Sequence, residues 1–192
     1  MRLRGEGRRM TREPGWEQRL LTVFDDLEQQ AAAAFGAERE AEVAERARSE
    51  YAGVTLATRL MAARDTRVTL AVEGVGAVSG VLQRVAADWC LLGAGGQDWI
   101  VRLPAVGSVR GLPSHAVAEA AWPVTARLGL GSALRRVADG GEECRVRLRD
   151  GTAYDARLGR VGADFVEVIS GDHAETWVLA FAALAAVHSR ET

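Results

Sequence analysis

Residues 84–89 read Arg-Val-Ala-Ala-Asp-Trp, and residues 160–165 read Arg-Val-Gly-Ala-Asp-Phe. The two stretches lie 76 residues apart, and further residues match at the same offset on their N-terminal side. After a two-residue insertion, residues 99–101 (Trp-Ile-Val) match residues 177–179 (Trp-Val-Leu). Matches of this kind at a nearly constant offset rarely arise by chance. The sequence therefore predicts an internal duplication.

Beyond residue 67, apolar and polar residues alternate, which is the pattern of half-buried β-strands. The alternating residues are Val68, Leu70 and Val72 in the first copy and Cys144, Val146 and Leu148 in the second. In the second copy we expect five short strands, at about residues 143–149, 153–161, 164–170, 175–180 and 185–188. Five short strands with one apolar face bury that face most readily by curling into a small barrel.

Residues 68–70, Gly74, Gly80 and Leu82, followed by residues 99–109, resemble the barrel of Sm-like proteins, in particular the family of bacterial Sm-like RNA chaperones. SH3-like barrels share most of this pattern. The resemblance covers roughly 90 of the 192 residues, in two copies. Members of this family form rings that bind single-stranded RNA, and the resemblance implies the same activity here. The Lys-His pair that this family carries before its last strand is replaced by Leu-Pro at residues 103–104 and by Phe-Ala at residues 181–182.

The sequence thus predicts an α+β chain in which an N-terminal helical segment precedes two tandem five-stranded small β-barrels of the Sm or SH3 type. The expected segments are a disordered basic tail (1–14), a helical segment (15–66), a first barrel (67–112), a helical linker (113–142) and a second barrel (143–189). The tail holds five Arg and two Glu without apolar periodicity, which is typical of disorder. It is open whether the tail precedes a true start at Met10 or forms an arm that touches nucleic acid.

The helical segment carries one apolar stripe, because its large apolar residues recur at spacings of three and four. The stripe begins with Trp16, Leu20, Phe24 and Leu27. It either packs on the protein's own barrels or serves as a helix for self-association or for a protein partner, and both interpretations are open at this stage. The far face is rich in acidic residues, which argues against binding to a membrane surface.

Composition excludes several classes of protein. The chain holds 24 basic and 26 acidic residues and 48% hydrophobic residues, so it is neither a strongly basic nucleic-acid coat nor a disordered polyanion. All basic residues are Arg, and Lys and Asn are absent, which suggests a GC-rich, bacterial genome. The N-terminus is charged and lacks the apolar region of a secretory signal, so we expect no such signal, and no apolar run reaches membrane-span length. Cys90 and Cys144 are expected to be reduced and structural, in a cytoplasmic protein.

Candidate binding residues are few. Arg145, Arg147 and Arg149 alternate on one predicted strand, so all three face the same way. They form either a solvated strand face or a site for nucleic-acid phosphates. Trp89 either belongs to a barrel core or stacks on bases.

No catalytic constellation emerges. The three histidines have no metal-ligand spacing with the two cysteines, and no Lys is present for a phosphate-binding loop. We therefore expect no enzyme, no cofactor and no metal. The sequence favours a non-enzymatic interaction or scaffold protein with a protein partner or self-association, and no membrane. The alternative is a nucleic-acid-binding regulatory protein, with RNA favoured over DNA.

Overall fold

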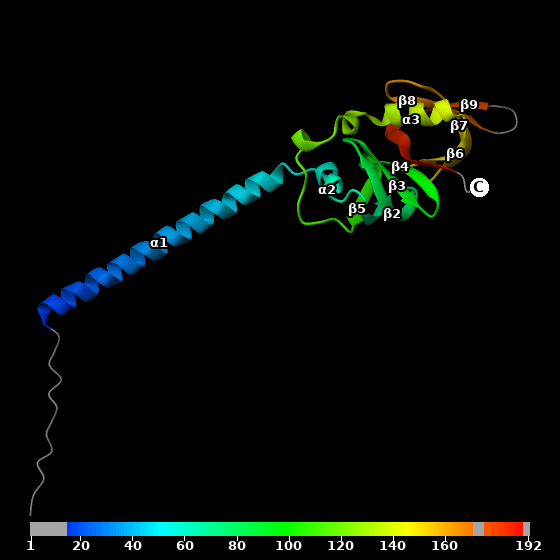
Figure 1. Cartoon of the computed structure of the whole chain (residues 1–192). Coiled ribbons are helices and arrows are strands. Elements are labelled where there is room, and N and C mark those ends of the chain that lie inside the picture. The colour runs from blue at the N-terminus through cyan, green and yellow to red at the C-terminus, as the bar shows by residue number, and fades with distance from the viewer. Residues whose placement is uncertain (1–14, 171–174, 190–192) are drawn as a thin grey trace, which may run out of the picture. The chain divides into compact units, whose positions relative to one another are not determined.

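The computed structural model describes residues 15–170 and 175–189 and divides the chain into two compact units, residues 1–53 and 54–192 (Figure 1). Among the described residues, the first unit contains one long helix, and every strand belongs to the second unit. The predicted α+β class is therefore confirmed. The predicted disordered tail lies outside the described residues.

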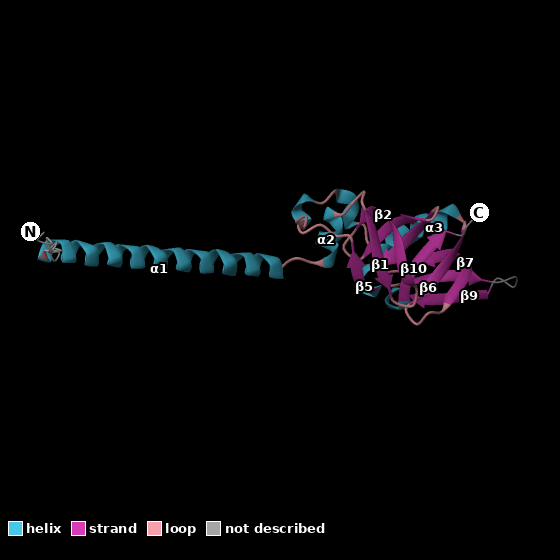
Figure 2. Ribbon diagram, turned by 90° about the horizontal axis from the view of Figure 1, so that it is seen from below, coloured by secondary structure: helices cyan, strands magenta, loops and turns pink. Residues whose placement is uncertain are grey.

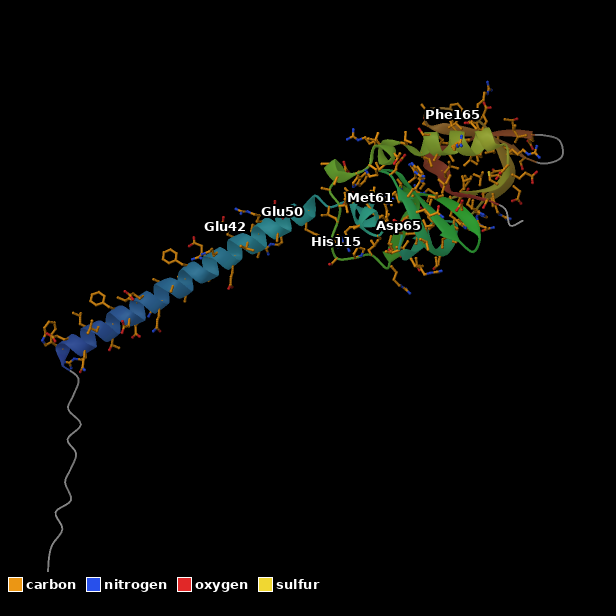
Figure 3. All side chains as sticks on the ribbon, in the orientation of Figure 1. Glu42, Glu50, Met61, Asp65, His115 and Phe165 are labelled. Carbon is orange, nitrogen blue, oxygen red and sulfur yellow. The ribbon has the colours of Figure 1, made fainter. Side chains whose placement is uncertain are left out.

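The long helix α1 (Trp16–Ala52) contains 37 residues, and none of them is buried. Figure 3 shows its side chains projecting from the helix, Glu42 and Glu50 among them. Short-range ion pairs, from Arg46 to Glu42 and from Arg48 to Glu45, support its C-terminal half. Its apolar residues remain exposed, since they have no contact surface within the first unit.

The second unit begins with α2 (Leu56–Ala62), whose start is fixed by a reciprocal cap. The Thr55 hydroxyl accepts from the backbone N–H of Thr58 at 3.2 Å, and the Thr58 hydroxyl accepts from the N–H of Thr55 at 3.0 Å. Leu60 and Met61 on α2 are buried against the strands of the first copy. The side-chain cap thus fixes the residue at which α2 begins, and the buried side chains of α2 pack it against the sheet.

Ten strands follow in the described part of the second unit, and in several of them buried and exposed residues alternate. They are β1 (Arg67–Val72), β2 (Gly76–Val85), β3 (Trp89–Ala94), β4 (Gln97–Arg102), β5 (Val106–Arg110), β6 (Glu143–Leu148), β7 (Ala153–Val161), β8 (Phe165–Ser170), β9 (Glu175–Ala180) and β10 (Leu184–Ser189). All pairs are antiparallel, in the order β5-β1-β2-β3-β4-β10-β6-β7-β8-β9 (Figure 2). The second half repeats the strand order of the first half.

The strands form one continuous sheet that does not close, so two separate five-stranded barrels are not confirmed. The physical reason lies at β4. Instead of pairing with β5 of its own half, β4 pairs with β10, with Val101 opposite Ala186, Ile100 opposite Val187 and Trp99 opposite His188. A short 3₁₀ turn precedes the fifth strand of each half, at Leu103–Ala105 and at Phe181–Ala183.

The connection between the halves contains two 3₁₀ turns (Glu119–Ala121 and Val124–Arg127) and the helix α3 (Leu130–Gly140). Leu130 and Leu134 of α3 join the buried cluster formed by the second half. Each cluster also borrows residues from the other half: Trp89 enters the second cluster, and Ala186 enters the first. The two halves therefore share their cores and fold as one body.

A close backbone approach fixes how the halves meet. Gly74, in the turn between β1 and β2, has φ +69°, and a Cβ there would collide with the carbonyl oxygen of Leu148. Only glycine meets both requirements, since it tolerates positive φ and carries no side chain. The first half's hairpin turn can therefore rest directly on the end of β6.

Candidate functional site

The three predicted arginines share one face of the sheet at β6, as their alternation predicts. Their side chains are opposite to the buried Cys144, Val146 and Leu148. Arg149 donates to Glu73 Oε2 from Nε at 2.8 Å, and its Nη2 lies 2.7 Å from the same oxygen. Arg145 Nη1 lies 3.6 Å from Asp155 Oδ2. Arg147 donates to the carbonyl of Gly74 at 3.5 Å.

Two of these arginines thus connect the halves, because Glu73 and Gly74 belong to the β1–β2 turn. Of these two contacts, only the one between Arg149 and Glu73 is an ion pair, and an exposed ion pair stabilises a fold by about 0–1 kcal/mol. Arg147 and Arg149 therefore stabilise the junction between the halves, and the side chain of Arg149 stays partly exposed to solvent.

Trp89 lies elsewhere, at the start of β3. Its ring is buried, and its indole N–H donates to the carbonyl of Leu128 at 2.8 Å. It lines a cavity that none of Arg145, Arg147 and Arg149 lines. The structure therefore does not bring the predicted tryptophan and the predicted arginines into one site.

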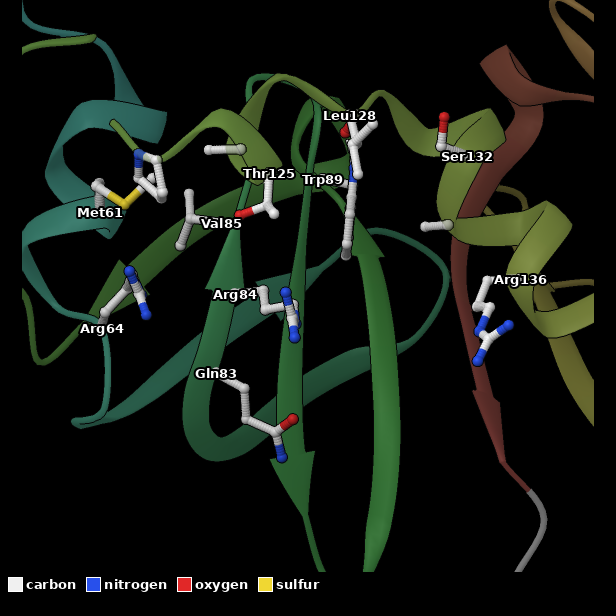
Figure 4. A pocket seen from close by; sticks show the side chains of 13 residues that line it. Met61, Arg64, Gln83, Arg84, Val85, Trp89, Thr125, Leu128, Ser132 and Arg136 are labelled. Carbon is white, nitrogen blue, oxygen red and sulfur yellow. Dashed lines mark hydrogen bonds between the residues drawn. The ribbon is translucent and has the colours of Figure 1, made fainter. Parts of the chain in front are cut away.

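The cavity at Trp89 is a feature that the sequence did not reveal. It has a volume of about 490 Å³. Figure 4 shows Arg84 between Arg64 on one side and Arg136 on the other, with Trp89 beside Arg84. The lining residues are Met61, Arg64, Gln83, Arg84, Val85, Trp89, Pro123, Thr125, Ala126, Leu128, Ser132, Ala133 and Arg136. Arg84 opens the repeated sequence stretch, but no spacing in the sequence links it to Arg64 or Arg136.

The junction of β4 and β10 is held by an aromatic stack. The rings of Trp99 and His188 lie 3.9 Å apart and are inclined by 17°. His188 is only 8% exposed, and burial, followed by the nearby charges of Arg147 and Arg145, lowers its pKa below the ordinary value. Trp99 Nε1 and His188 Nε2 are buried without a hydrogen-bond partner in the described part of the chain. A neutral imidazole therefore suits this site.

Both cysteines are buried and free. Burial raises the pKa of Cys90 to about 12, and burial together with the charge of Asp155 raises that of Cys144 to about 11. Neither is an activated nucleophile, because the thiolate is the reactive form. Within residues 15–170 and 175–189, no group of three His, Cys, Asp or Glu side chains could hold a metal ion.

The predicted association residues Trp16, Leu20, Phe24 and Leu27 all lie exposed on α1, at 68%, 47%, 54% and 54%. None of the helices in the described ranges combines the length and apolar character that a membrane span requires.

The sheet ends in two strands that have a free side, β5 and β9. On β9, Trp177 is 43% exposed and Val178 is 64% exposed. Their counterparts in the first half, Trp99 and Ile100, are partly buried and lie on a strand whose edge is paired with β10. β9 therefore keeps a free edge at the position where its counterpart β4 is paired with β10. No model of a known protein family and no curated protein matches this chain.

Proposed function

We propose that this chain is a non-enzymatic scaffold protein, built from duplicated small-barrel units, that assembles with copies of itself. The observation that supports this proposal best is the junction of β4 with β10. It joins the fourth strand of one half to the fifth strand of the other, and it leaves a fifth strand, β5, and a fourth strand, β9, at the two ends of the sheet, each paired on one side only.

The junction supplies a template for contact between two copies. Transferring its register by the 78-residue offset pairs Leu179 with Ser108, Val178 with Val109 and Trp177 with Arg110 of a second copy. An Arg guanidinium then takes the place of the imidazole against the indole ring, a contact that cation–π attraction favours. Each new strand pair satisfies backbone groups that the free edges expose to solvent.

Such a contact joins two different edges, so it is heterologous. Heterologous contacts produce closed rings when the rotation between subunits closes and open filaments when it does not. Both outcomes suit a scaffold, because each added copy presents the same surfaces again.

Helix α1 is the second association element in this proposal. It is about 55 Å long at 1.5 Å per residue, and its apolar stripe is exposed along Trp16, Leu20, Phe24 and Leu27. Most helices in proteins owe their stability to packing of an apolar face. A second copy of α1, laid along this stripe, supplies that packing.

Light scattering coupled to size-exclusion chromatography tests the assembly. We expect the native chain to exceed its monomer mass of 20.6 kDa and Val178→Glu to lower the mass of the assembly. Ile169→Glu is the matched control, because Ile169 is 41% exposed on β8 but that strand is paired on both sides. A native chain that is monomeric at high micromolar concentration, or a Val178→Glu assembly of unchanged mass, would contradict the proposal.

Nucleic-acid binding is the second candidate function, with RNA as the favoured ligand. It is supported by the shared face of Arg145, Arg147 and Arg149, of which the carboxylates of Asp155 and Glu73 occupy only the outer two. Fluorescence anisotropy of labelled single-stranded RNA and duplex DNA, at two salt concentrations, tests it. Salt-sensitive binding that the triple alanine variant abolishes supports this candidate, and no binding at micromolar protein rejects it.

A further inference from the structure

The residues that line the cavity beside Trp89 carry a net positive charge. Its charged lining residues are Arg64, Arg84 and Arg136, and among the described residues no carboxylate lines it. The three arginines come from separate elements: Arg64 follows α2, Arg84 lies on β2 and Arg136 lies on α3. The fold therefore brings three positive charges to one hollow from positions far apart in the sequence.

Some other arginines of the second unit form ion pairs with carboxylates. Arg149, Arg160 and Arg157 lie 2.7, 2.9 and 3.7 Å from Glu73, Glu167 and Glu143, respectively. In the part of the chain that the structure describes, neither Arg64 nor Arg84 nor Arg136 forms such an ion pair. Guanidinium groups that line one cavity without a carboxylate repel one another, and a bound anion offsets that repulsion.

The remaining lining residues define the shape of the ligand. Gln83, Thr125 and Ser132 add neutral hydrogen-bonding groups. Val85, Ala126 and Leu128 form an apolar wall together with Trp89, whose ring is fixed by its hydrogen bond to the Leu128 carbonyl. A volume of about 490 Å³ lies within the range of small-molecule sites. The cavity thus offers cationic groups along an apolar, aromatic wall.

A second cavity of about 470 Å³ adjoins the first and shares Arg84, Trp89 and Arg136 with it. Carboxylates do line this neighbour, namely Asp98, Glu142 and Glu143. An anionic group is therefore favoured in the first cavity, near Arg64, and disfavoured in the second cavity, near the three carboxylates. This polarity gives a ligand one preferred orientation.

We propose that this cavity binds a phosphate-bearing ligand with a flat ring, the chemistry of a nucleotide. The phosphate groups lie among Arg64, Arg84 and Arg136, since the planar guanidinium fork matches phosphate oxygens in two-point contacts. The ring lies against the wall at Trp89. The nucleotide is either free or part of a single strand, because both carry the same phosphate and ring.

The cavity is lined by residues from both halves of the second unit and from the long linker between them. Arg84 belongs to the first half, Thr125 to the linker and Arg136 to the helix that covers the second half. A ligand that contacts all three holds α3 against β2. This proposal does not depend on the assembly of copies, because all the lining residues come from one chain.

Isothermal titration calorimetry of the full chain at low salt tests the site, with inorganic pyrophosphate, ADP and decauridylate as probes. We expect saturable binding of pyrophosphate and tighter binding of ADP. Arg84→Gln or Arg136→Gln should weaken each by about tenfold, the effect of losing one charge-assisted hydrogen bond. The matched control is Arg135→Gln, which removes the same charge from the neighbouring residue of α3, outside the cavity.

Each outcome is decisive once circular dichroism confirms that the variants are folded. Binding of ADP that matches or exceeds that of decauridylate identifies a free nucleotide, and stronger binding of decauridylate identifies a strand. Arg84→Lys, which keeps the charge but not the fork, should bind between the native chain and Arg84→Gln. The proposal is overturned if no probe binds saturably, or if Arg135→Gln weakens binding as much as Arg136→Gln does.

Discussion

Replacing Gly74 by alanine perturbs the contact between the two halves at a single atom. Gly74 adopts φ +69°, and placing an L-residue in this left-handed region costs about 1–2 kcal/mol. The added Cβ also collides with the backbone of Leu148 and Arg149. These atoms cannot retreat cheaply, because the N–H of Leu148 donates to Thr152 and the N–H of Arg149 donates to Ala183, both at 2.9 Å.

Gly95 provides the matched control. It also has positive φ, at +61°, but nothing lies within 4 Å of the Cβ that alanine would add. Gly95→Ala should therefore carry only the conformational cost. Gly74→Ala carries in addition an overpacking cost of about 1–3 kcal/mol, so the free energy of unfolding should fall by about 2–5 kcal/mol in total.

Urea denaturation followed by circular dichroism gives the free energy of unfolding of both variants. We expect Gly74→Ala to be the less stable of the two by at least about 1 kcal/mol. Equal stability of the two variants would show that the β1–β2 turn does not rest on β6, and the described junction between the halves would then be wrong.

Three further predictions concern His188, the two cysteines and the apolar stripe of α1. The lowered pKa of His188 means that the unfolded chain binds a proton more readily than the folded chain does. The neutral His188 ring therefore contributes to the stability of the fold above pH 6.5, and this contribution is lost as the pH falls below that value. Thermal melts between pH 8 and 5 should show the loss as a lower melting temperature. The loss should be smaller in His188→Gln. Cys90 and Cys144 should react with a thiol reagent only after denaturation, because burial keeps both thiols protonated; stoichiometric labelling of the folded chain would contradict their placement. Leu20→Glu combined with Phe24→Glu should lower the mass of the assembly in light scattering, and an unchanged mass would remove α1 from the association surfaces.

Local structure could be predicted well from the sequence, because alternation of side chains is a local property. The predicted strand at residues 175–180 coincides with β9, and the predicted strand at 143–149 differs from β6 by one residue. The choice of partner strands could not be predicted in this way. Alternation shows which face of β4 is buried, but it does not show that β10 rather than β5 covers its edge.

The candidate site was harder to predict for the same reason. Arg145, Arg147 and Arg149 were visible because they alternate on one strand, yet the carboxylate of Glu73 that meets Arg149 lies 76 residues away in the chain. Arg64, Arg84 and Arg136 share no periodicity at all, since tertiary packing of three elements brings them together. A charge cluster of this kind emerges only when the fold is known.

Cross-linking between copies tests the edge-to-edge assembly most directly. Val109→Cys combined with Val178→Cys places two thiols opposite each other in the register transferred from the β4–β10 junction, while the buried native cysteines stay protonated. Under oxidising conditions we expect a ladder of disulfide-linked multimers on a non-reducing gel, and few multimers when Val109→Cys is combined with Ile169→Cys. Monomers alone, or equal ladders from both pairs, would contradict assembly through β5 and β9.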